Sequence, residues 1–224
     1  MPDYTSIHSR LVATTPAYQD LLATLAATGA ELDLPDGTRW AVPCSTGEFV
    51  EAMAGVGGAW ELRDYDETVR KRALAHLQAL GMAVHDAHVD FETSEAIGDG
   101  EAALILCVHA LHIVEAPRQD LVLQQMADGL APGGAVVLVG FCRQEWLPMT
   151  LWRVARHEGG LRAAWELAPW RFADVLAHFA FDFNVRRPPE VLQAALRATG
   201  LEVSEPTSVF KGCSTLLVGR KPAS

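Results

Sequence analysis

Two hydrophobic periods alternate along this chain, and their order predicts an α/β fold. Short apolar runs typical of buried strands begin near residues 40, 60, 83, 102 and 135. Between them, apolar residues recur at three- and four-residue spacings, as in Phe49, Val50, Met53 and Ala54, and this spacing is typical of an amphipathic helix. Because strands that alternate with helices pair in parallel through right-handed crossovers, we expect a mostly parallel sheet.

Residues with special backbone properties mark where the predicted elements end. Asp66 is expected to cap a helix over 68–80 that Gly81 terminates, with the basic residues Arg70, Lys71 and Arg72 on its solvated face. Similar signals predict helices over 4–30 in two pieces (Pro16 opening and Gly29 closing the second), from Pro117 to 130, and over 190–199 with Gly200 as the stop. They also predict a turn at 132–134 and strands over 40–43, 83–89, 135–141, 202–210 and 214–220.

The stretch Thr38–Asp66 carries the clearest functional pattern. A strand enters the small-residue loop Cys44, Ser45, Thr46 and Gly47, a helix follows, and a second strand ends in Asp64. A loop that leads from a strand directly into a helix points backbone N–H groups at a ligand, and an acid after the second strand is placed to accept hydrogen bonds from a ribose diol. The stretch therefore predicts half of a nucleotide-binding unit.

This pattern resembles the class I S-adenosylmethionine (SAM)-dependent methyltransferases, nearest to their small-molecule branch with the ubiquinone- and menaquinone-type enzymes. The family's first motif is acid-x-Gly-x-Gly-x-Gly, and this chain has Ala41, Pro43, Ser45 and Gly47 at those positions, so the last glycine alone is kept. Pro43 has no N–H group, and Ser45 adds a side chain where the backbone is expected to approach the ligand. The stretches LCVHALHIVEAPRQDLVLQQMADGLAPGGAVVLVGF and STLLVGRKP extend the resemblance over most of the chain.

The resemblance implies a Rossmann-like α/β fold with seven strands, the last antiparallel, and helices on both faces. It makes 1–224 one domain, with an N-terminal helical segment (1–30) and a helical lid insert (141–187). It also implies SAM as the cofactor, held by Cys44, Ser45, Thr46, Gly47, Asp64, Tyr65, Asp90, Phe91 and Val108. Among these, Asp90 and Phe91 would contact the adenine, although Asp90 can equally be a loop residue that starts a turn.

His109 and His112 follow the predicted fourth strand, close to where the family binds the methionine end of the cofactor. Either is a candidate base for a hydroxyl acceptor, and either can instead be structural. Tyr4, His8 and Tyr18 are candidate substrate contacts from the N-terminal segment, or residues that pack on the sheet edge.

No metal site is expected. His85 and His88 are three residues apart in a predicted strand, so their side chains point to opposite faces and do not form a metal-binding pair.

The segment from 141 to 183 holds nine of the seventeen aromatic residues of the chain. It lies where the family builds a substrate lid, and such aromatic density can wall a pocket for a planar or lipophilic molecule. The candidate substrate contacts in this insert are Trp146, Trp152, Trp165 and Trp170. A small hydrophobic subcore or a dimer contact is the alternative.

Composition narrows the class of protein further. A formal charge of −10 with scattered basic residues disfavours a nucleic-acid partner, and four cysteines without a C-x-x-C pair favour buried free thiols. No apolar run approaches the ~20 residues that span a bilayer, so we expect a cytoplasmic protein without a membrane partner. We expect it to be a monomer or a homodimer.

Three functions fit these observations. The first is a SAM-dependent methyltransferase acting on a small aromatic, quinone-like or polyketide-type molecule. The second is an enzyme of secondary metabolism on the same fold that catalyses a cyclisation or rearrangement without consuming SAM, favoured by the changed first motif. The third is a non-catalytic subunit that stabilises an active homologue.

Overall fold

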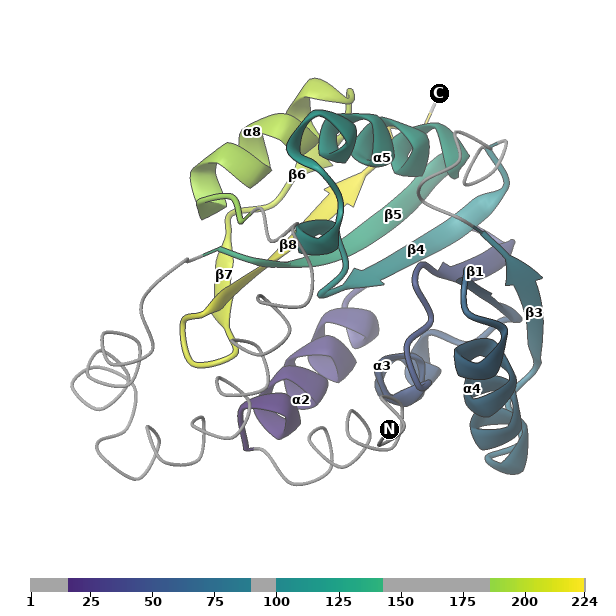
Figure 1. Ribbon diagram of the computed structural model, residues 1–224. Helices are drawn as coiled ribbons and strands as arrows, with labels where there is room; N and C mark the ends of the chain where they lie inside the picture. Colours follow the sequence, from purple (N-terminus) through teal and green to yellow (C-terminus); the bar gives the residue numbers. More distant parts are fainter. Residues whose placement is uncertain (1–15, 90–99, 143–185, 224) are drawn as a thin grey trace.

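A computed structural model describes residues 16–89, 100–142 and 186–223, in which one eight-stranded sheet is flanked by helices (Figure 1). The strands are β1 (Thr38–Ala41), β2 (Trp60–Asp64), β3 (Val84–His88), β4 (Ala102–Val108), β5 (Leu130–Phe141), β6 (Glu202–Val203), β7 (Thr207–Val209) and β8 (Ser214–Arg220). The helices are α2 (Pro16–Ala30), α3 (Glu48–Ala52), α4 (Glu67–Ala79), α5 (Ala116–Gly129) and α8 (Pro189–Ala198), with short 3₁₀ turns at Ala54–Val56 and Leu111–Ile113.

The order of the strands is β3-β2-β1-β4-β5-β8-β6, with β7 also paired to β8. The pairs among β1 to β5 are parallel, whereas β8 runs antiparallel to β5, β6 and β7. The expected Rossmann-like α/β sheet is therefore confirmed. It has eight strands instead of seven because the strand predicted over 202–210 is two pieces, β6 and β7, that share one edge of β8.

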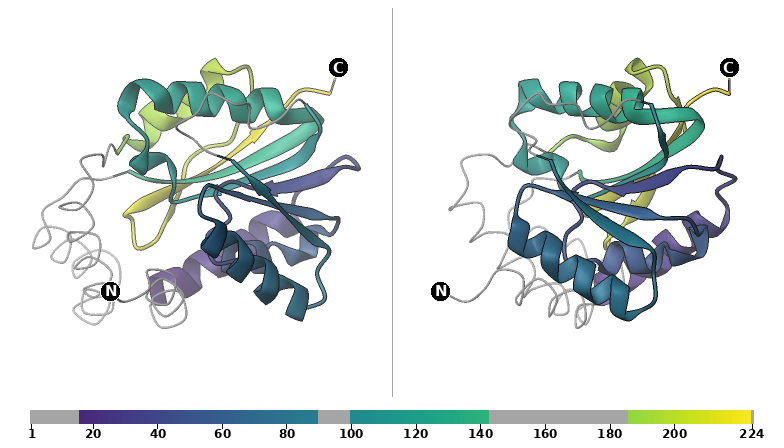
Figure 2. Two further views of the ribbon diagram at one scale, coloured as in Figure 1. Left: turned by 45° about the vertical axis from the view of Figure 1, so that its right-hand side comes forward. Right: turned by 90° about the vertical axis from the view of Figure 1, so that its right-hand side faces the viewer.

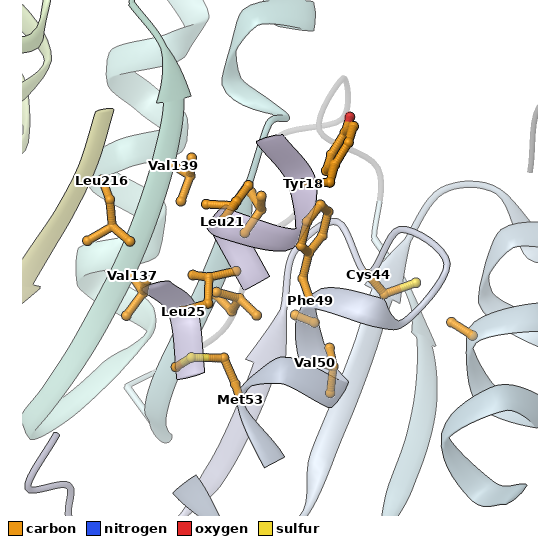
Figure 3. Close-up of a cluster of buried hydrophobic side chains, with 14 of the residues drawn as sticks. Tyr18, Leu21, Leu25, Cys44, Phe49, Val50, Met53, Val137, Val139 and Leu216 are labelled. Carbon is orange, nitrogen blue, oxygen red and sulfur yellow. The ribbon is translucent and has the colours of Figure 1, made fainter. Parts of the chain in front are cut away.

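Helices cover both faces of the sheet, so the sheet separates two hydrophobic cores. The views in Figure 2 show α2, α3 and α4 on one face and α5 and α8 on the other. On the first face, Leu21 and Leu25 of α2 lie against Val137 and Val139 of β5 (Figure 3). On the second, α5 packs through Val122, Leu123 and Met126. Strands buried on both sides read as continuous apolar runs, as β4 does.

Several predicted boundaries hold for the expected physical reasons. Asp66 caps α4, because its carboxylate accepts hydrogen bonds from the N–H groups of Thr68 and Val69. Gly81 and Gly200 follow α4 and α8 with φ of 76° and 88°, the left-handed conformation that ends a helix. Pro16 begins α2 as expected.

Other expectations are corrected by the structure. Gly29 lies inside α2, where an added Cβ would be 2.9 Å from Val56 Cγ2, so close packing and not helix termination requires this glycine. The segment 132–134 belongs to the irregular beginning of β5, and Pro43 lies beyond β1. Arg70 is buried by the ends of β2 and β3, where a solvated side chain was expected.

Two findings concern the wider chemistry of the chain. All four cysteines are free and buried, as predicted from the absence of a C-x-x-C pair and from the apolar runs that hold three of them. Within residues 16–89, 100–142 and 186–223, no helix combines the length and the apolarity that crossing a bilayer requires.

Candidate functional site

The candidate site lies at the carboxyl ends of the parallel strands, next to β1. The chain runs from β1 outward through β2 to β3 and then returns to β4 on the other side of β1. The loops that follow β1 and β4 therefore leave the sheet in different directions, and ligands of open α/β sheets bind at this switch point. The described candidate residues come from the ends of β1, β2 and β4 and from α2.

The loop after β1 is fixed by hydrogen bonds to both neighbouring strands. The Val42 N–H donates to Leu106 O of β4 (2.8 Å), and the Cys44 N–H donates to Arg63 O of β2 (3.0 Å). Ser45 has a φ of 51°, which is unusual for a residue other than glycine. The Thr46 hydroxyl donates to the Glu48 carboxylate at the beginning of α3.

Gly47 is the one glycine of the expected motif, and its lack of a side chain lets the loop pass α4. Its φ is 97°, and an added Cβ would lie 3.2 Å from His76 Cδ2 and 3.3 Å from Leu77 Cγ. The last glycine of the phosphate-binding fingerprint has the same packing role in dinucleotide-binding folds. Gly47 therefore sets the separation between this loop and α4.

Asp64 is the last residue of β2 and is 5% exposed. Its Oδ1 accepts a hydrogen bond from the Asp66 N–H (3.1 Å), and its Oδ2 accepts from the Cys44 thiol, with 3.9 Å between Sγ and Oδ2. Burial is the main cause that raises the pKa of Asp64 above its ordinary value. The side chain of the next residue, Tyr65, is 58% exposed.

The Cys44 thiol stays protonated beside this carboxylate. Burial raises the pKa of Cys44 strongly, and the negative charge of Asp64 raises it further. Cys107 in β4 is also protonated, because burial raises its pKa to about 12. Since the thiolate is the nucleophilic form of cysteine, neither side chain is suited to nucleophilic chemistry, and Cys44 acts as a weak hydrogen-bond donor to Asp64.

Arg70 of α4 reaches back over the turn that follows β2. Its Nη1 donates to Asp64 O (2.6 Å) and lies 3.4 Å from His88 Nδ1, and its Nε lies 3.6 Å from the Asp86 carboxylate. The guanidinium thus joins the ends of β2 and β3, and its positive charge lowers the pKa of Asp64, against the larger effect of burial.

His109 follows β4 in a left-handed conformation with a φ of 51°. Its N–H donates to Val139 O of β5 (2.8 Å), and its Nε2 lies 2.9 Å from Ser214 Oγ at the beginning of β8. The imidazole stacks on Phe141, with ring centroids 4.0 Å apart and planes 10° apart. Residues of β5 and β8 therefore set the position of a ring that follows β4.

Further aromatic rings surround His109. Tyr18, Phe49 and Phe210 contact its imidazole edge-on, with centroids 6.2, 6.4 and 5.1 Å away. The ring of His112 stands edge-on to Phe141 at 4.8 Å. In Figure 3 the rings of Tyr18 and Phe49 lie next to each other between α2 and α3. The candidate base is thus part of an aromatic cluster at the carboxyl ends of β4 and β5.

The structure brings the described candidates together in two groups. Cys44 and Asp64 form the first, with Tyr65 beside them, and Tyr18, His109 and His112 form the second. Val108 is the buried last residue of β4 and directly precedes His109. Eight further candidates lie outside the described residues: Tyr4, His8, Asp90, Phe91, Trp146, Trp152, Trp165 and Trp170.

Five side chains of these groups were not recognised as site residues from the sequence: Phe49, Arg70, Phe141, Phe210 and Ser214. Phe49 follows the helical core pattern, and Phe210 and Ser214 stand at strand ends without any motif. Phe210 lies in the short turn between β7 and β8, and Gly212, which has a φ of 72°, is the sequence signal for that turn. Nothing in the order of residues links Ser214 to His109, which is 105 positions away.

No metal-binding cluster of three or more His, Cys, Asp or Glu side chains occurs in the described parts of the chain.

The residues of the candidate site fit the nucleoside end of SAM better than its methionine end. Asp64 offers a buried carboxylate to a ribose diol, with the exposed ring of Tyr65 next to it. At the methionine end, Ala41 is 1% exposed and provides no acid, and Pro43 provides no N–H group.

Comparison with known proteins supports the same type of domain. Residues 41–134 match the family model described as a methyltransferase domain. None of the curated proteins compared with the chain matches it.

Solved structures similar to the chain include an O-methyltransferase family protein from Burkholderia thailandensis (TM-score 0.66, 16% identity, 93% of this chain and 57% of that one). Another is the magnesium protoporphyrin IX methyltransferase from Synechocystis PCC 6803 with bound SAH (TM-score 0.61, 14% identity, 99% and 89%). A third is the pyocyanin biosynthetic protein PhzM (TM-score 0.61, 16% identity, 90% and 55%).

The chain thus spans little more than half the length of two of these proteins. At such low identity the likeness concerns the fold. The described part of the chain has the fold of the SAM-dependent methyltransferases, and the segment that holds the loop after β1 and Asp64 matches their methyltransferase domain.

Proposed function

We propose that the protein is a SAM-dependent methyltransferase that acts on a small aromatic, quinone-like or polyketide-type molecule. The observation that carries the proposal is Asp64: a buried carboxylate at the end of β2, held beside the loop after β1, inside the segment that matches the methyltransferase domain. An acid at this point accepts hydrogen bonds from the ribose hydroxyls of a bound nucleoside.

The substrate class is inferred from the aromatic cluster around His109. Rings from α2, α3, β5 and the β7–β8 turn meet there, at the carboxyl end of β4 where an acceptor would approach a cofactor held by Asp64. Aromatic side chains favour planar or lipophilic ligands because they bury large apolar areas and stack. The O-methyltransferase family protein among the similar structures agrees with a hydroxyl acceptor.

Methyl transfer needs an acceptor in line with the sulfonium, exclusion of water and, for a hydroxyl acceptor, removal of a proton. SAM supplies the methyl group, and the electrons of the broken C–S bond stay on sulfur. We assign the removal of the acceptor's hydroxyl proton to His109. When Nε2–H donates to Ser214 Oγ, the lone pair of the imidazole is on Nδ1, which is buried, and that nitrogen would take the proton. His112, in contact with the same Phe141 ring, is the second candidate.

Calorimetric titration with SAM and with its demethylated product tests the proposal. Binding is expected for both, and Asp64→Ala should weaken it by about 1–3 kcal/mol, the cost of leaving buried hydrogen-bonding groups unpaired. Asp66→Asn is a suitable control, since Asn also caps helices. An unchanged titration for Asp64→Ala would remove Asp64 from the site, and no binding to wild type would contradict the proposal.

One observation favours the alternative of a non-methylating enzyme on this fold: the loop after β1 lacks the acid and the N–H group that hold the methionine moiety. Turnover distinguishes the two functions. A methyltransferase requires SAM and forms the demethylated product in an amount equal to the methylated acceptor. Turnover by freshly desalted, cofactor-free protein would support the cyclisation or rearrangement instead.

A further inference from the structure

Arg70 is the buried cation next to the candidate nucleoside site. It is 8% exposed, although it belongs to a basic run, Arg70 to Arg72, on an otherwise amphipathic helix. Burying a guanidinium has a large desolvation cost unless it is paired and hydrogen-bonded. The contacts that offset this cost are therefore informative about why an arginine stands at this position.

Those contacts lie at the ends of two strands. Nη1 donates to the carbonyl oxygen of Asp64 at the end of β2 and lies near Nδ1 of His88 at the end of β3, and Nε faces the Asp86 carboxylate. The backbone N–H of Arg70 donates to Asp66 O, so the same residue also belongs to the first turn of α4. Nε has no hydrogen-bond partner among the described residues and faces Asp86 as an ion pair at 3.6 Å. The planar guanidinium presents Nη1 and Nε to these partners at once, which a lysine ammonium cannot do as well.

The charged and titratable groups around the Asp64 carboxyl come from three segments: the loop after β1, α4 with its cap, and β3. Cys44 in the loop after β1 donates its thiol proton to the carboxylate, and Asp66 at the beginning of α4 adds a negative charge. Arg70 of α4 is the positive charge that acts on this carboxyl, and Asp86 and His88 of β3 lie against Arg70. Burial raises the pKa of Asp64 most, and the negative charge of Asp66 adds to this. The hydrogen bond from the Asp66 N–H, the positive charge of Arg70 and the Tyr65 N–H lower the pKa.

We propose that Arg70 is a positioning residue of the cofactor site: it fixes the backbone of Asp64 and supplies the positive charge that keeps the side chain of Asp64 an anionic acceptor for a vicinal ribose diol. This inference rests on the proposed function, because it requires that Asp64 binds the ribose. It adds a residue that touches no ligand and acts through Asp64 alone.

The sign of the expected pH effect follows from the charges. Loss of the Arg70 charge raises the pKa of Asp64, so the carboxylate becomes protonated at higher pH, and affinity for a ribose-containing ligand then falls off at higher pH than in wild type. Loss of the Asp86 charge leaves the Arg70 charge less compensated, so Asp86→Asn shifts the fall to lower pH.

The experiment uses the full chain and two probes, S-adenosylhomocysteine and 5′-methylthioadenosine, titrated calorimetrically between pH 5 and pH 8. Arg70→Met should weaken binding of both probes roughly 2- to 10-fold near neutral pH, the range for one lost hydrogen bond, and more at pH 5. It should also reduce the preference for 5′-methylthioadenosine over its 2′-deoxy analogue. Arg70→Lys restores the charge and should return the pH profile toward that of wild type.

Lys71→Met is the matched control, because it removes one positive charge from the neighbouring position. Lys71 is solvent-exposed and pairs with Glu67 along the helix. Equal pH profiles for Arg70→Met and Lys71→Met would overturn the inference while the proposed function stands, provided that Asp64→Asn still weakens binding. Failure of wild type to bind either probe would overturn the proposed function and the inference with it.

Arg70→Met removes buried contacts, so its fold is checked by thermal unfolding. If that variant does not fold, Asp86→Asn tests the positioning role instead. The Asp86 side chain is partly exposed, and asparagine has the same shape as aspartate. A fall in affinity that moves to lower pH supports the positioning role. A pH profile identical to that of wild type would contradict it.

Discussion

The imidazole of His109 lies parallel to the ring of Phe141, with centroids 4.0 Å apart and planes 10° apart. Phe141 ends β5 and is in register with Ser214 of β8, whose hydroxyl contacts Nε2 of the same imidazole. The candidate base is therefore held by two adjacent residues on neighbouring strands. Side chains on sheet strands are positioned more precisely than side chains on loops, as a proton-transfer group requires.

Replacing His109 tests its role in proton transfer. His109→Asn is the suitable change, because asparagine tolerates the left-handed backbone conformation that His109 adopts. Turnover of a hydroxyl acceptor should fall about 10²- to 10⁴-fold, the usual contribution of a general base, while SAM affinity is retained. The measurement is S-adenosylhomocysteine formation with the best acceptor from a panel of phenols and hydroxyquinones. Unaltered turnover in His109→Asn, with a loss in His112→Asn, would transfer the role to His112.

The buried carboxyl of Asp64 is expected to destabilise the folded protein at neutral pH. Its pKa is raised in the folded state, so its favourable contribution to stability is complete below the ordinary pKa near 4 and is lost as the pH rises through the folded-state value. Asp64→Asn, which removes the charge, should therefore raise the Tm at pH 7 by a few degrees and change it little at pH 4. Asp66→Asn, at a partly exposed helix cap, removes only the smaller contribution of the Asp66 charge to the pKa of Asp64, so it should raise the Tm at pH 7 less than Asp64→Asn does. A lower Tm for Asp64→Asn at pH 7 would contradict this direction of the effect.

Restoring the acid of the first motif should make stability depend on the cofactor. Ala41 is the last residue of β1, paired with Leu62 and Leu106 and packed in the core, so an ionised Ala41→Asp side chain costs several kcal/mol without a partner. A bound methionine ammonium would provide that partner. Saturating SAM is expected to raise the Tm of Ala41→Asp more than that of wild type, as thermal unfolding can measure. An equal rise in both proteins would place the ammonium elsewhere.

The tryptophans of the insert are expected to set substrate selectivity. Replacing Trp146, Trp152, Trp165 or Trp170 by alanine, one at a time, should in at least one case raise the KM for the acceptor and leave SAM affinity in place, because a lost aromatic wall removes contacts to the substrate alone. Steady-state kinetics with calorimetry provide both values. If all four variants either unfold or retain full turnover, the segment has a role in packing or association.

Much of the fold follows from local patterns in the sequence. The apolar run of β4, the cap of α4 at Asp66 and the stops at Gly81 and Gly200 depend on interactions between residues close in the chain, so they were correctly predicted. The split between β6 and β7 was missed, since the pattern over 202–210 is continuous and the pairing partner decides where it breaks.

The candidate site shows the same division. The order of strand, loop, helix and acid predicted by itself that Asp64 stands at the end of β2 beside Cys44, because the βαβ crossover brings these strand ends together. The tertiary structure alone decided that Arg70 is buried behind Asp64 and that Ser214 contacts His109. The local sequence around a helical arginine or a strand serine is the same whether its side chain faces solvent or contacts a distant strand. The packing of the whole sheet determines which of these surroundings the side chain has.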